Sequence, residues 1–86
     1  MSTSEPELHR MVRARIDDGR LTYDPPANVW GEQGTGALCV VCGKPIGPDE
    51  IEYEVQLVAY LPLICRLHFH CHAAWRAECD LGNSAR

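Results

Sequence analysis

Four residues in the second half of the chain have the types and the spacing of a metal site. Cys39 and Cys42 form a C-x-x-C pair followed by Gly43, and His68 and Cys71 form an H-x-x-C pair further along. Zinc in structural sites takes four tetrahedral ligands, usually thiolates and imidazoles. We therefore expect one structural Zn²⁺, held by Cys39, Cys42, His68 and Cys71.

The spacing of each pair suits this role. Two intervening residues let both sulfurs of a C-x-x-C pair face one ion from a tight turn, and Gly43 allows the positive φ that such a turn needs. In the second pair, residues three apart at the start of a helix point the same way. The helix N-terminus also favours a thiolate at Cys71, through its dipole and its free N–H groups.

The tract around the second pair holds other possible ligands. Exchange of His68 for His70, His72 or Cys65 would still give four ligands, and a chain without zinc is a further alternative. Otherwise we expect the imidazoles of His70 and His72 to be exposed to solvent. We expect Cys65 and Cys79 to be small buried apolar residues.

A β-hairpin is predicted between the two ligand pairs. The residues I-E-Y-E-V-Q-L at 51–57 alternate between apolar and polar, which predicts a strand with Glu52 and Glu54 on a solvent-exposed face. Together with Asp49 and Glu50 these acids would line the wet face and edge of that strand. The residues Tyr60-Leu61-Pro62 predict a turn, and residues 63–67 the returning strand.

A helix is predicted over residues 70–81, and Gly82 is expected to end it. Cys71, Trp75 and Cys79 are spaced four apart, so they share one face of this helix. The metal site would therefore lie against the core.

A second helix is predicted near the N-terminus, over residues 5–18. Ser4 is a suitable N-cap, Glu7 completes a capping box, and Gly19 is a stop signal. One face carries an apolar stripe, which we expect to pack on the hairpin or on the C-terminal helix; an unpacked stripe would be a surface for a partner. The stripe consists of Leu8, Met11, Val12 and Ile16.

The segment Thr22–Leu38 is expected to be irregular, because paired prolines and spaced glycines break both helices and strands. Trp30 is expected to be buried as an anchor of this segment, and an exposed contact for a partner is the alternative. The chain then divides into a helical region (1–21), a linker (22–37), a zinc-binding domain (38–82) and a tail (83–86).

The order of these motifs resembles a treble-clef zinc finger. It is similar to the first zinc module of LIM domains, and to short uncharacterised bacterial proteins with C-x-x-C-G, an acidic strand and H-x-x-C-x-x-x-W; here the last motif ends at Trp75. The resemblance implies a small α+β fold of zinc knuckle, β-hairpin and C-terminal helix, to which this chain adds an N-terminal helix.

Composition limits the possible functions. The chain has 86 residues, with 8 Lys and Arg against 12 Asp and Glu and a net charge of -4, which argues against a general nucleic-acid binder. Its longest uncharged stretches are shorter than the roughly 18 apolar residues that span a bilayer, and its first twenty residues lack the apolar run of a secretory signal. Five cysteines, an odd number, then indicate metal ligation in a reducing cytoplasm.

A zinc ion with four protein ligands has no open position for water, so we expect no enzyme. The sequence predicts a small cytoplasmic protein with a structural zinc, acting as a protein–protein interaction module or regulator. Its expected partner is another protein, with no membrane and no nucleic acid involved. A nucleic-acid-binding zinc finger and a zinc or redox sensor that uses the spare Cys and His residues are the alternatives. The oligomeric state is left open.

Overall fold

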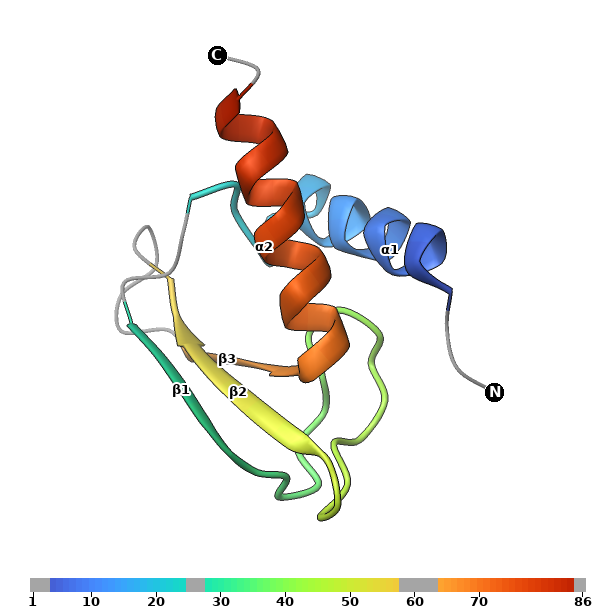
Figure 1. Cartoon of the computed structure of the whole chain (residues 1–86), viewed down its shortest axis with the longest axis vertical. Coiled ribbons are helices and arrows are strands. Elements are labelled where there is room, and N and C mark those ends of the chain that lie inside the picture. The colour runs from blue at the N-terminus through green and yellow to red at the C-terminus, as the bar shows by residue number, and fades with distance from the viewer. Residues whose placement is uncertain (1–3, 25–27, 58–63, 85–86) are drawn as a thin grey trace.

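Two helices and a three-stranded antiparallel sheet make up the computed structural model, which describes residues 4–24, 28–57 and 64–84. The elements are α1 (Glu5–Asp17), β1 (Asn28–Gln33), β2 (Ile51–Gln56), β3 (Ile64–His68) and α2 (Phe69–Ser84), and the strands lie in the order β1-β2-β3. In Figure 1, α2 crosses one side of the sheet and α1 lies beside α2, away from the strands. The predicted small α+β class is confirmed.

Helix α1 begins at the predicted N-cap, Ser4. The side chain of Ser4 accepts a hydrogen bond from the N–H of Glu7, and the chain leaves the helix through Gly19, whose φ is +85°. The apolar stripe packs against α2, with Leu8 and Val12 fully in the core and the other two members partly buried. Of the two predicted docking sites, the C-terminal helix is therefore the correct one.

A buried carboxylate adds a polar contact between the two helices. Glu78 of α2, which is 5% exposed, faces two basic side chains of α1. Its oxygens lie 2.8 Å from Nδ1 of His9 and 3.4 Å from Nη1 of Arg13. These contacts specify how the two helices sit against each other, because a buried carboxylate must keep its partners.

Strand β1 corrects the expectation that Thr22–Leu38 is irregular. Asn28–Gln33 pairs with β2 over six residues, and all six are exposed. A strand whose two faces are both exposed needs no alternation of apolar and polar residues, so the pattern that reveals β2 is missing from β1. Trp30 is 48% exposed, so the expected buried anchor is also wrong.

The buried tryptophan is Trp75, on α2. Its side chain is 0% exposed, and its indole N–H donates to the carbonyl of Thr22 at 2.8 Å. The predicted shared face of α2 is confirmed, because Cys71, Trp75 and Cys79 are all buried in the core.

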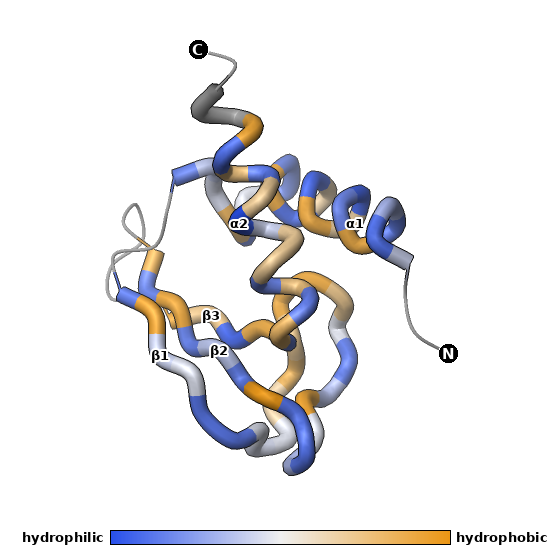
Figure 2. Tube along the Cα trace, in the orientation of Figure 1, coloured by the Kyte–Doolittle hydropathy of each residue, from blue (hydrophilic) through white to orange (hydrophobic). Residues whose placement is uncertain are grey.

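Polar and apolar residues alternate along β2, as the hydropathy colours of Figure 2 show, but one of its acids lies in the interior. Val55 is buried as predicted, whereas Ile51 is exposed and Glu52 is fully buried. The predicted exposed face is therefore wrong at Glu52, because the segment after β1 brings Thr35 against its carboxylate. Since β2 is the middle strand, its acids do not line an edge either.

The turn of the hairpin lies outside the described residues, and the end of α2 differs from its prediction. The predicted turn at 60–62 and the predicted first residue of the returning strand, Leu63, lie outside the described residues. Helix α2 continues through Gly82 to Ser84, so the predicted stop at Gly82 is wrong. The glycines with positive φ in the described chain are Gly19, Gly36 and Gly43. Neither described helix has the length and apolarity of a membrane span.

Candidate metal centre

A tight turn presents the first pair of cysteines. The N–H of Gly43 donates to the carbonyl of Cys39 at 2.9 Å, and the N–H of Cys39 donates to Lys44 at 3.0 Å. Gly43 has a φ of +75°, in the left-handed region that a residue with a side chain rarely adopts. Gly43 thus has the positive φ that the sequence predicts for the turn Cys39–Gly43, which we call the knuckle.

The knuckle is tied to β3, which leads to the second pair. The N–H of Val40 donates to the carbonyl of Arg66 at 2.9 Å. Two residues later β3 ends at His68, and Cys71 follows in the first turn of α2. One backbone hydrogen bond thus places the turn with Cys39 and Cys42 beside the junction of strand and helix.

The donor atoms of Cys39, Cys42, His68 and Cys71 all lie within 4.8 Å of one another. A tetrahedral Zn²⁺ with bonds of about 2.3 Å to sulfur and about 2.0 Å to nitrogen separates its ligand atoms by roughly 3.5–3.8 Å. Sγ of Cys42 and Nδ1 of His68 are 3.4 Å apart, close to that ligand spacing. Cys39 and Cys71 are buried, and the other two donors are partly exposed. The four residues therefore fit a zinc ion in number, chemistry and spacing.

The orientation of His68 indicates which ring nitrogen faces the site. Nδ1 faces Cys42, while Nε2 lies 3.1 Å from the carbonyl of Pro45 and 3.7 Å from a carboxylate oxygen of Glu50. A ligating histidine usually donates its other N–H to a carbonyl or carboxylate, which sets the tautomer and the ring orientation. Pro45 and Glu50 can perform this role. No sequence signal identifies them, because the contact depends on how the knuckle folds back on β3.

Without a cation, ionisation of one of the three thiols disfavours ionisation of the other two. A hydrogen bond with Cys71 lowers the pKa of Cys39, and the same contact raises the pKa of Cys71. Burial raises the pKa of Cys42. Three neighbouring thiolates repel one another, so a divalent cation is what would let all three ionise together.

The alternative ligands are not members of the cluster. His70 is exposed, as expected, and Cys65 and Cys79 are buried. His72 is partly buried, contrary to expectation, because its ring stacks on Tyr53 with centroids 4.5 Å apart and planes 11° apart. Burial, and then the charge of Arg76, lower the pKa of His72. Among the described residues, the cluster of Cys and His donors is therefore the predicted set of Cys39, Cys42, His68 and Cys71, and not one of its alternatives.

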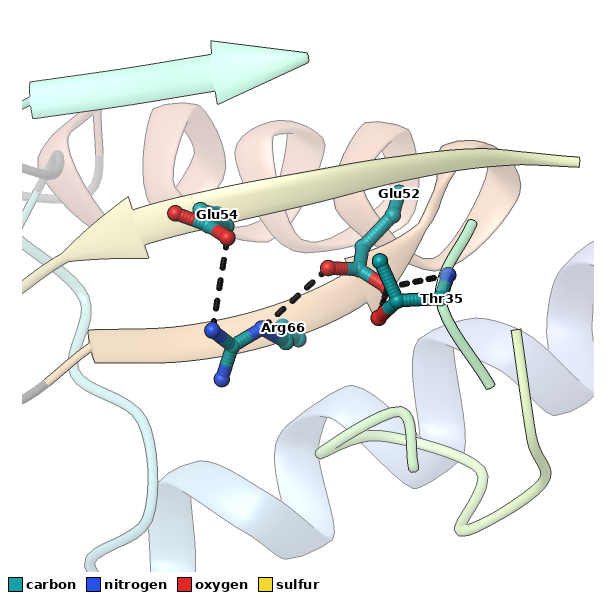
Figure 3. A network of polar contacts seen from close by, with 4 residues as sticks. All are labelled: Thr35, Glu52, Glu54 and Arg66. Atoms are coloured by element: carbon teal, nitrogen blue, oxygen red, sulfur yellow. Dashed lines mark hydrogen bonds and ion pairs between the residues drawn. The ribbon is translucent and has the colours of Figure 1, made fainter. Parts of the chain in front are cut away.

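A second group of possible ligands is acidic and already has a cationic partner. Carboxylate oxygens of Glu32, Glu52 and Glu54 lie within 4.8 Å of one another. Figure 3 shows Arg66 reaching two of these acids, with Nε 3.1 Å from Glu52 and Nη2 3.3 Å from Glu54. The guanidinium balances the charge of two of the three acids, and exposed acidic groups are common without an ion, so this cluster does not indicate a metal.

No family model, no curated protein and no solved structure matches the chain. Function therefore has to be inferred from the site and the surfaces of this chain.

Proposed function

We propose that the chain binds one structural Zn²⁺ through Cys39, Cys42, His68 and Cys71, and that it works as a small protein–protein interaction module or regulator. The observation that carries the proposal is the convergence of four donor atoms within 4.8 Å from two distant parts of the chain. The order of knuckle, β2–β3 hairpin and α2 supports a treble-clef arrangement, in which the helix supplies a ligand from its first turn.

A structural role for the ion follows from the ligand set. Four protein ligands fill the tetrahedron and leave no position for a water molecule, whereas catalytic zinc keeps one open. The core is also built from small side chains: apart from Trp75, all of its buried members are Leu, Val, Ile, Ala or Cys. Binding of structural zinc supplies on the order of 10 kcal/mol in small fingers, comparable to the whole stability of an ordinary domain. The ion is therefore proposed as a condition for folding.

The surface favours a protein partner over nucleic acid. Large apolar side chains are exposed at several points, among them Trp30, Ile64 and Phe69. Arg66 and Arg13 face carboxylates, and the chain carries a net charge of -4. Paired arginines on an acidic chain offer little attraction to a phosphate backbone.

The sensor alternative receives less support, because the spare thiols are enclosed. Cys65 and Cys79 are both buried, and redox-sensing cysteines are usually accessible thiolates. We therefore keep the interaction module as the proposed function.

Cobalt substitution tests the ligand set. We expect Co²⁺ to bind one per chain with the absorption of three thiolates and one imidazole. His68→Ala should change that spectrum and weaken metal binding, whereas the matched variant His70→Ala should leave both unchanged. A spectrum that responds to His70→Ala and not to His68→Ala would contradict the proposed site.

Affinity capture tests the interaction role. The zinc-loaded chain is compared with a Cys39→Ser/Cys42→Ser double variant, which should lack the ion. We expect at least one stable partner protein that is recovered with the wild type and lost with the variant. Recovery of the same proteins with both chains, under several growth conditions, would count against an interaction module.

A further inference from the structure

We propose that β1 pairs antiparallel with β1 of a second copy of this chain, which joins two three-stranded sheets into one. In the proposed pairing, Trp30 of each copy lies opposite Trp30 of the other. This inference goes beyond the proposed function, because it concerns the edge of the sheet formed by β1, whereas the Cys/His cluster lies at the end of β3, the strand at the opposite edge.

The outer side of β1 has main-chain groups that bond to none of the residues that the structure describes. The N–H of Gly34 donates to the carbonyl of Glu50, one step beyond the last pair of the β1–β2 ladder. Peptide groups alternate in direction along an antiparallel strand, so the even-numbered residues of β1 bond with β2. Val29, Gly31 and Gln33 therefore turn their N–H and C=O groups outward. In the sheet formed by the described residues, no strand pairs with that side.

Most of the devices that normally block such an edge are missing from residues 28–33, where Glu32 is the one charged residue. The segment N-V-W-G-E-Q contains no proline, lysine or arginine, and its register with β2 runs without a bulge. All six residues are exposed, and Val29 and Trp30 are among the large apolar residues at the surface. An edge with apolar side chains and a single charge is a template for another strand.

The charges select one register for a second copy. A pairing centred on Glu32 places two carboxylates opposite each other, and one centred on Gly31 places them on the adjacent diagonal. A pairing centred on Trp30 places the two Glu32 side chains at opposite ends of the paired segment. Each Glu32 then faces Asn28 of the other copy, whose amide is able to donate a hydrogen bond.

The same register is self-complementary in its other positions. Trp30 faces Trp30, and aromatic pairs across strands stabilise a sheet. Val29 faces Gly31, so the outward N–H and C=O groups of these two residues form the ladder in both directions. Glu32 gains a donor at a place where a hydrogen bond with Glu54 and the charge of that same carboxylate raise its pKa. The strand that fits this edge is therefore β1 of a second copy.

Sedimentation equilibrium of the zinc-loaded full chain tests the proposal. The mass should rise from 9.6 kDa toward twice that value as the concentration increases between about 1 µM and about 1 mM. Val29→Pro removes an outward N–H and leaves the even-numbered bonds to β2 intact, since proline is tolerated at a strand edge. It should weaken dimerisation at least about tenfold, while Val29→Thr, which keeps the N–H and the β-branched shape, should not.

A second readout uses the two tryptophans. Trp75 is buried and Trp30 is 48% exposed, so acrylamide quenching reports mainly on Trp30. Quenching should decrease with protein concentration in the wild type and in Val29→Thr, and should stay constant in Trp30→Ser. The proposal would be overturned if the wild-type chain stayed monomeric throughout this range. It would also be overturned if the Val29→Pro variant dimerised as strongly as the wild type. Zinc content, measured on the same samples, separates this outcome from a failure of the metal site.

Discussion

The carboxylate of Glu52, which is 0% exposed, accepts a hydrogen bond from Nε of Arg66 at 3.1 Å. The same carboxylate accepts hydrogen bonds from the N–H and the hydroxyl of Thr35, at 3.1 Å and 2.8 Å. Glu52 thereby joins β2, β3 and the segment that leads from β1 to the knuckle. The carbonyl of Arg66 accepts the bond from Val40, so one residue links this network to the turn that holds the cysteines.

Glu52→Gln should lower the free energy of unfolding by about 2 kcal/mol, because it removes the charge that Arg66 and Thr35 face in the interior. Glu54→Gln is the matched control. Glu54 is partly exposed and contacts the exposed end of Arg66, so its loss should cost less than about 1 kcal/mol. Denaturant unfolding of both zinc-loaded variants measures the difference. Equal losses would show that the burial of Glu52 contributes nothing specific.

Substitution of Trp75 should destabilise the fold much more than substitution of Trp30. Trp75→Phe removes part of a fully buried ring and the hydrogen bond to Thr22, and should destabilise the fold by about 2–3 kcal/mol. Trp30→Phe should change stability by no more than about 0.5 kcal/mol, because Trp30 lies at the surface. Thermal unfolding at low protein concentration is the measurement. A larger loss at Trp30 would contradict the assignment of Trp75 as the core tryptophan.

Cys79 should be an unreactive thiol in the folded protein. Burial, partly opposed by the charge of Arg76, raises its pKa from 9.0 to about 11. At pH 8 its thiolate fraction is then about a hundredfold below that of a free cysteine, and alkylation should be slower by at least that factor. Mass spectrometry of the iodoacetamide-treated, zinc-loaded chain measures the rate.

The same pKa shift affects stability at alkaline pH. The folded-state pKa lies above the unfolded value, so the contribution of Cys79 to stability is complete below about pH 9 and is lost as the pH rises through about 11. Cys79→Ala should therefore flatten the loss of stability in this alkaline range. An unchanged pH profile, or alkylation of Cys79 as fast as of an unfolded peptide, would argue against its burial.

The residues brought together at the candidate site could be predicted because their spacing is local. A C-x-x-C-G turn and an H-x-x-C pair at a strand–helix junction each fix two donors through short stretches of backbone, as Cys39–Gly43 and His68–Cys71 do. The helices could be predicted for the same reason, since caps and apolar stripes are written in neighbouring residues. Even so, the predicted end of α2 at Gly82 is wrong, because a glycine in the last turn does not have to stop a helix.

Long-range contacts account for the failures. The alternation in residues 51–57 predicts a strand with two different faces, but not what covers each face, and Thr35 covers the carboxylate of Glu52. Strand β1 is formed by its bonds to β2, and its own six exposed residues carry no periodic signal. Trp30 is exposed because it pairs with Glu54, on the face of the sheet opposite to Tyr53, and α2 lies on the Tyr53 face, where His72 stacks on that ring.

Metal removal tests the central claim most directly. The purified chain is analysed for zinc, and its circular dichroism and proton NMR spectra are recorded before and after exhaustive chelation. We expect one zinc ion per chain, loss of dispersed amide signals on chelation, and their return when Zn²⁺ is added back. A chain that is purified without metal, or that keeps its dispersed spectrum after chelation, would contradict the proposal that zinc at Cys39, Cys42, His68 and Cys71 organises this fold.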